Sequence, residues 1–147
     1  MKLSDTVKDK QTRSQVAADC VELIDEQVAA KGGLSGLALK AAYGALRGIG
    51  PSYVSGAIER LLPETLKALD PMWQTGVQAG DPVAYLVDNR SQTADTILSV
   101  TDTRIQRTDN GIVSASYSKL RKSIKGDVEA AVPGLAKIID NHAQVAS

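Results

Sequence analysis

Apolar residues recur at helical spacings along nearly the whole chain. Between residues 14 and 30 they occupy every third or fourth position, with acidic side chains between them, at Val16, Cys20, Leu23, Ile24 and Val28. Similar patterns follow over residues 52–62, 91–107, 113–124 and 128–139. This period is typical of amphipathic α-helices. Alternating β-branched runs separated by hairpin turns are missing, so the pattern predicts an all-α protein.

The stretch over residues 32–50, "GGLSGLALKAAYGALRGIG", differs from the other predicted helices. Apolar and small residues cover more than half of its helical circumference, and only Lys40 and Arg47 interrupt them. A helix that is apolar on most sides is typical of the centre of a bundle, and small residues let neighbouring helices approach closely. We therefore predict that this segment is the core helix.

Prolines divide the rest of the pattern into short elements. Pro63 is predicted to break or kink the helix over residues 52–62, because proline lacks the amide donor that continues a helix and clashes with the preceding turn. Asp70-Pro71 and Asp81-Pro82 each resemble an N-cap aspartate followed by proline in the first turn. Pro133-Gly134 is predicted to interrupt the last helix. We expect a bundle of six to eight helices, several of them short and punctuated by proline.

Length and composition are consistent with one globular domain. The 147 residues are 43% apolar and contain no Phe, so Leu, Ile, Val and Ala must form the core. A chain of this length buries roughly 70% of the surface it exposes when unfolded. We expect a single compact helical domain over residues 1–147, with frayed ends at 1–13 and 142–147.

Charge is balanced along the chain. The 17 Lys and Arg residues match 17 Asp and Glu residues, and the two halves on either side of Trp73 are balanced as well. The run "KLRKSIK" over residues 119–125 holds four cations, which we interpret as a solvated helix face. Binding through nucleic-acid phosphates usually requires a broader basic surface, so no nucleic-acid partner is expected.

The sequence also bears on location. A single cysteine, Cys20, excludes an internal disulfide and a cysteine-based zinc site. The N-terminal residues are polar, and no run approaches the ~18–20 apolar residues of a membrane span. We expect a cytoplasmic protein without a transmembrane segment.

Several segments resemble an uncharacterised bacterial family, a domain of unknown function common in actinobacteria and cyanobacteria. The matching pieces are "KGGLSGLALKAAYGAL", "AIERLLPETLKALDP", "ADTILSVTDTR" and "VEAAVPGLAKII". They occur in order through most of the chain. The resemblance implies a helical fold and carries no activity, ligand or catalytic residue.

No catalytic or metal-binding arrangement stands out. A nucleophilic pair would require Cys20 and His142, but Cys20 lies within an apolar helical face and His142 lies near the chain end. The carboxylates Glu22, Asp25 and Glu26 lack the Glu-x-x-His pattern of helical di-metal sites. Asp95 and Asp102 share another helix face, interpreted as solvated. We predict no catalytic residues, no metal and no cofactor.

Binding residues are easier to nominate. Lys40, Arg47 and Arg104 lie on or beside apolar helical faces. If enclosed, they need carboxylate partners, because an unpaired buried charge is very unfavourable. They are expected either to form ion pairs that fix helix register or to line an anion pocket. Trp73 either contributes to an exposed partner surface or closes one end of the core.

Three functional hypotheses remain from the sequence. The first is a non-catalytic interaction or structural protein, either a homo-oligomer or one that binds a protein partner. The second is a small-molecule or lipid-binding protein, with an anion-accepting groove beside the helices over residues 33–62. The third is an enzyme that uses carboxylate acid–base chemistry.

Overall fold

The computed structural model describes residues 2–146, with side chains described as far as residue 143. Within these residues, the chain is all-α and has no strand, which confirms the predicted bundle of six to eight helices. A short 3-10 helix, η1 (Leu3–Val7), precedes seven α-helices. These are α1 (Lys10–Ala30), α2 (Gly33–Arg47), α3 (Tyr53–Gln78), α4 (Pro82–Asp88), α5 (Arg90–Ile105), α6 (Gly111–Leu120) and α7 (Ile124–Ala146).

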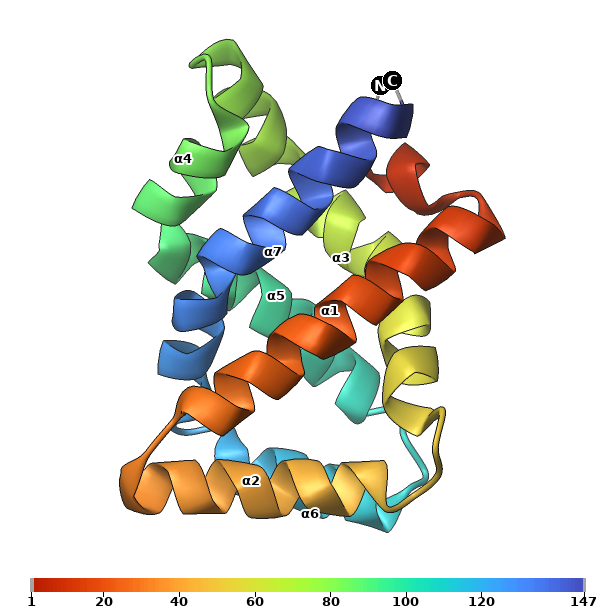
Figure 1. Ribbon diagram of the computed structural model, residues 1–147, viewed down its shortest axis with the longest axis vertical. Helices are drawn as coiled ribbons and strands as arrows, with labels where there is room; N and C mark the ends of the chain where they lie inside the picture. The colour runs from red at the N-terminus through yellow and green to blue at the C-terminus, as the bar shows by residue number, and fades with distance from the viewer. Residues whose placement is uncertain (1, 147) are drawn as a thin grey trace.

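The helices form a body and an end layer. The body consists of η1, α1, α3, α4, α5 and α7, with α3 packed against η1, α1, α4 and α5. The end layer consists of α2 and α6, which lie side by side across one end of the body, at the bottom of Figure 1. The candidate functional site lies between these two parts, where the end layer covers the body.

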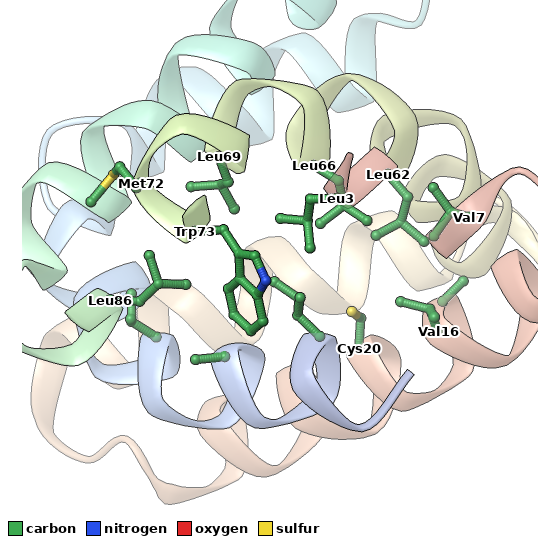
Figure 2. Packing of buried hydrophobic residues seen from close by; sticks show 14 residues of the cluster. Leu3, Val7, Val16, Cys20, Leu62, Leu66, Leu69, Met72, Trp73 and Leu86 are labelled. Carbon is green, nitrogen blue, oxygen red and sulfur yellow. The ribbon is translucent and has the colours of Figure 1, made fainter. Parts of the chain in front are cut away.

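The hydrophobic core lies in the body and is centred on α3. Leu66 and Leu69 are buried completely on one face of α3, and Trp73 is buried one turn further on. Figure 2 shows the Trp73 indole extending from α3 toward α7, close to Leu86 of α4. Of the two sequence readings of Trp73, the structure corresponds to a core position and not to an exposed surface.

Helix α3 is continuous through both of its prolines, which corrects the predicted break at Pro63 and the predicted new helix at Pro71. An interior proline costs about 3 kcal/mol because it removes a hydrogen bond and crowds the preceding turn. Burying a large apolar side chain contributes roughly 1.5–3 kcal/mol. The five apolar side chains that α3 buries therefore outweigh both prolines; they are Leu62, Leu66, Leu69, Met72 and Trp73.

The two Asp-Pro pairs have different roles. Asp81 caps α4 as predicted, accepting a hydrogen bond from the Ala84 amide at 3.0 Å. Asp70 instead accepts from the Leu3 amide at 2.7 Å and so ties η1 to α3. Leu3 and Val7 are buried in the core. Residues 3–13 are helical apart from residues 8 and 9, and fraying of residues 1–13 stays a prediction.

The C-terminal helix also differs from the prediction. Helix α7 continues through Pro133 and Gly134, and Gly134 lets α7 approach the Leu23 side chain of α1 so closely that a Cβ atom would clash with it. The His142 imidazole lies 2.7 Å from the Asp19 carboxylate. The frayed end predicted at 142–147 falls partly outside the described side chains, and residue 147 lies outside the described residues.

The Gly- and Ala-rich helix α2 is not the core helix, which corrects the main sequence prediction. Leu34 is 85% exposed and Leu37 is 64% exposed, whereas only Gly36, Leu39 and Ala42 are buried. Helix α2 lies in the end layer, so one face meets the body and the opposite face meets solvent. Periodicity shows how much of a helix is apolar, but it does not show whether another element covers each side.

Candidate ligand-binding cavity

A large cavity separates the end layer from the body. Its volume is about 720 Å³, and side chains from α1, α2, α3, α5, α6 and α7 line it. The body contributes Leu23, Ile58 and Ile97 among others, and the end layer contributes Leu39 and Val113. We call this space the interlayer cavity.

Most of the interlayer cavity wall is aliphatic. The body supplies Cys20, Leu23, Ile24, Val28, Val54, Ala57, Ile58, Leu61, Leu62, Ile97, Ile105, Ile124, Val128, Ala131 and Leu135. The end layer supplies Leu39, Leu46, Val113 and Leu120. A wall of this kind gives water few hydrogen-bond partners and favours an apolar occupant.

The polar part of the wall contains three arginines. Arg60 of α3 and Arg107 of the loop after α5 are exposed, whereas Arg104 of α5 is partly buried. Within residues 2–143, none of the three has a carboxylate within 4.0 Å. Asp109 also lines the cavity and is exposed. Because Arg60, Arg107 and Asp109 reach solvent, they mark where the cavity opens.

Helix α2 is fastened to the body through one aspartate of α1. The Tyr43 hydroxyl donates to Asp25 Oδ1 at 2.5 Å, and Arg47 Nη1 donates to the same oxygen at 3.0 Å. The Arg47 guanidinium also lies 5.6 Å from the Tyr43 ring centre. Burial, and then the hydrogen bond to Asp25, raise the pKa of Tyr43 to about 12. The tyrosine therefore remains a neutral donor throughout the physiological range.

Helix α6 is fastened to α5 in the same way. The Tyr117 hydroxyl donates to Asp102 Oδ1, and Arg121 donates from Nε to Oδ1 at 2.8 Å and from Nη2 to Oδ2 at 3.0 Å. The bidentate Arg121 contact, followed by the Tyr117 hydroxyl, lowers the pKa of Asp102. Burial raises the pKa of Tyr117. Each helix of the end layer thus contributes one tyrosine and one arginine, and both side chains bind one aspartate of the body.

Sequence reasoning missed the repeat that encodes these two contacts. Residues 43–47 read "YGALR" and residues 117–121 read "YSKLR", so both follow the pattern Tyr-x-x-Leu-Arg. Tyrosine and arginine four positions apart share one helix face. The intervening leucines, Leu46 and Leu120, line the interlayer cavity. The signal was present in the sequence, but five residues are too few to be noticed without the structure.

The four binding residues predicted from the sequence lie in different parts of the structure. Arg104 lines the interlayer cavity, but Lys40 is exposed and lies outside it. Arg47 is paired with Asp25, and its side chain is 59% exposed. Trp73 is buried in the core and is not among the residues that line the cavity.

The nucleophile considered from the sequence has the wrong properties. Burial, followed by the charge of Asp19, raises the pKa of the Cys20 thiol to about 12. A cysteine nucleophile needs the opposite shift, because the thiolate is the reactive form. His142 contacts Asp19. Within the described residues, no three His, Cys, Asp or Glu side chains are grouped closely enough to hold a metal ion.

The described helices also lack any segment whose length and apolar character would suffice for a bilayer crossing. A search of curated proteins and a search of solved structures each found no match. A family of unknown function, DUF6918, matches residues 3–143, which is nearly the whole chain. The chain therefore belongs to this all-helical family of unknown function.

Proposed function

We propose that this protein binds an amphipathic small molecule, with an apolar chain inside the interlayer cavity and an anionic group at Arg104. The observation that carries the proposal is the cavity itself, because it combines about 720 Å³ of aliphatic-walled space with a partly buried arginine that has no carboxylate partner within the described residues. Its volume falls within the range of about 300–1,000 Å³ that is typical of ligand pockets.

The size of the cavity supports an occupant. An empty apolar cavity costs about 24 cal/mol per Å³, so this one would cost on the order of 15 kcal/mol if it were dry and unfilled. That cost matches or exceeds the entire stability of a typical domain, about 5–15 kcal/mol. Water near the exposed residues reduces the cost, but the aliphatic wall offers water few partners. A ligand with an alkyl chain removes most of it.

The same comparison indicates the class of ligand. Each methylene group moved from water into an apolar site contributes about 0.8 kcal/mol, so a chain of about ten methylenes contributes roughly 8 kcal/mol before the costs of association. A carboxylate or phosphate placed beside Arg104 adds a charge-assisted hydrogen bond. Arg60 and Arg107 increase the positive potential where the cavity opens. A long-chain acid or a phospholipid-like molecule satisfies both requirements.

The other functional hypotheses remain predictions. A non-catalytic role agrees with simple ligand binding, and the raised pKa of Cys20 gives no support to thiolate catalysis. Acid–base catalysis by carboxylates is still a prediction, as are a cytoplasmic location and a homo-oligomer. None of these is favoured by a specific feature comparable to the interlayer cavity.

The proposal can be tested with cis-parinaric acid, a fluorescent long-chain acid, and with its methyl ester. We expect saturable binding of one acid molecule per chain. Arg104→Gln is expected to weaken binding of the acid about tenfold, because a charged hydrogen bond is lost, and to leave binding of the ester unchanged. Lys67→Gln, at an exposed position on α3, serves as the matched control.

Two outcomes would contradict the proposal. Absence of saturable binding by either probe would exclude an apolar ligand of this class. Equal loss of acid and ester binding in Arg104→Gln would show that Arg104 supports the cavity wall and does not recognise the anionic group.

A further inference from the structure

The balanced charge of the chain conceals a strongly basic end layer. No Asp or Glu occurs between Glu26 and Glu59 or between Asp109 and Asp127. These two stretches contain α2 and α6 with their flanking turns. They carry seven cations, which are Lys31, Lys40, Arg47, Lys119, Arg121, Lys122 and Lys125. The positive charge becomes visible only when the fold brings the two stretches together.

Four of these cations are paired with carboxylates, and the other three are not. Carboxylates of the body pair with Lys31, Arg47, Arg121 and Lys125. Lys40, Lys119 and Lys122 are exposed and have no ion-pair partner within the described part of the chain. The end layer therefore presents unneutralised positive charge to solvent.

The same layer carries the most exposed large apolar side chains of the described residues. Leu34 and Leu37 project from α2 with exposures of 85% and 64%, and Ile112 of α6 is also exposed. On a helical wheel, Leu34, Leu37 and Ala41 lie opposite the face that meets the body. The outer side of α2 is therefore an apolar ridge without a partner among the residues whose side chains the structure describes.

The apolar ridge lies at the same end of the layer as two of the unpaired lysines, Lys119 and Lys122. Lys31, just before α2, pairs with Asp127 in the first turn of α7, shortly after α6 ends. This pair brings the beginning of α2 close to the end of α6. Figure 1 shows the two helices side by side, with α2 beginning and α6 ending on the left. Leu34 and Leu37 are consequently near the segment that carries Lys119 and Lys122.

We propose that the end layer docks onto an anionic lipid surface, with Leu34 and Leu37 entering the interface and Lys40, Lys119 and Lys122 contacting lipid headgroups. Exposed leucines flanked by lysines are the combination by which helices lie in the plane of a bilayer. Positive charges near an anionic surface each add to the binding. This inference goes beyond the ligand proposal and rests on the outer face of the layer, so either can fail without the other.

Charge complementarity favours lipid over the alternatives. A second copy that docked symmetrically through this face would place the three unpaired lysines of one copy opposite the three unpaired lysines of the other. Nucleic acid would match the charge, but it would leave Leu34 and Leu37 without an apolar environment. An anionic bilayer provides both the negative charge and the apolar interior.

Flotation with vesicles tests the inference. The wild-type protein is expected to float with vesicles of phosphatidylglycerol and phosphatidylcholine in equal parts, and not with phosphatidylcholine alone. Lys119→Gln with Lys122→Gln is expected to reduce partitioning about thirtyfold, and Leu34→Ser with Leu37→Ser at least tenfold. The matched controls are Lys67→Gln with Lys137→Gln and Val77→Ser, which change exposed residues elsewhere and are expected to float normally.

Three results would overturn the inference. The first is absence of flotation at low salt while cis-parinaric acid still binds, which would leave the cavity proposal intact. The second is flotation that depends on the lysines but not on the leucines, together with equally strong binding of duplex DNA, which would identify a general polyanion surface. The third is a wild-type dimer that Leu34→Ser with Leu37→Ser converts to a monomer, which would assign the ridge to a second copy.

Discussion

Replacing Trp73 by alanine is expected to lower the free energy of unfolding by about 3–5 kcal/mol, because it removes the largest side chain of the core and leaves a cavity. Trp73 is 5% exposed and packs where α3, α4 and α7 meet. Chemical denaturation followed by far-ultraviolet circular dichroism measures the change. Trp73→Phe, which retains part of the ring, is expected to cost less than half as much.

The same substitution separates a core role from a binding role for Trp73. Because Trp73 is absent from the wall of the interlayer cavity, the folded fraction of Trp73→Ala should bind cis-parinaric acid with unchanged affinity. A loss of affinity in Trp73→Phe without a loss of stability would contradict this assignment and would place the indole at the ligand.

Phenylalanine substitutions at two alanines of α7 are expected to have opposite consequences. Ala131 lines the interlayer cavity, whereas Ala136 is completely buried in the core. Ala136→Phe should lower the free energy of unfolding by about 3 kcal/mol or more, because overpacking forces side chains and backbone apart. Ala131→Phe should change it by less than about 0.5 kcal/mol, because the ring extends into open space. Denaturation of both variants under the same conditions gives the comparison.

Ligand binding by the Ala131→Phe variant tests the same cavity independently of stability. Ala131→Phe should weaken cis-parinaric acid binding about tenfold or more, since the ring occupies volume that the chain needs. If both phenylalanine variants were equally destabilised, the space beside Ala131 would be filled in solution and the interlayer cavity would not exist as described.

The fold class could be predicted from the sequence, but the continuity of individual helices could not. Helical spacing predicts every major helix, and Asp81-Pro82 marks the start of α4 correctly. Pro63, Pro71 and Pro133 all suggested breaks that are absent, because a local penalty of a few kcal/mol is offset by burial that only the tertiary structure reveals. Asp70 has the sequence context of a cap and instead binds the Leu3 amide, sixty-seven residues away.

The candidate site could be predicted only in part. Arg104 was nominated as a cation beside an apolar face and lines the interlayer cavity, and its role in binding stays a prediction. Lys40 and Arg47 lie on the same helix as cavity residues but do not line the cavity, because Lys40 is exposed and Arg47 pairs with Asp25 of α1. Periodicity alone does not indicate which side of a helix meets the body. Asp25 and Asp102 looked like solvated acidic residues, because the tyrosines and arginines that bind them come from distant segments.

The basic end layer shows why a global property can mislead. Counting charges in the two halves of the chain gives a balance in each, yet α2 lies in the first half and α6 in the second. Their cations add only when the helices pack side by side. The apolar pattern of α2 was also misleading. Apolar residues on the side of α2 that meets the body and on the side that meets solvent give the same pattern in the sequence, so the whole helix was interpreted as buried.

The most direct test of the ligand proposal is a set of nuclear Overhauser contacts between bound palmitate and isoleucine methyl groups. Selective methyl labelling makes the isoleucines reporters of three environments: the interlayer cavity, the core at Ile139 and the exposed surface of α6 at Ile112. The cavity reporters are Ile24, Ile58, Ile97, Ile105 and Ile124. We predict contacts from the palmitate chain to the cavity methyl groups and none to Ile139 or Ile112. Contacts confined to Ile112, or no contacts at saturating palmitate, would contradict the account.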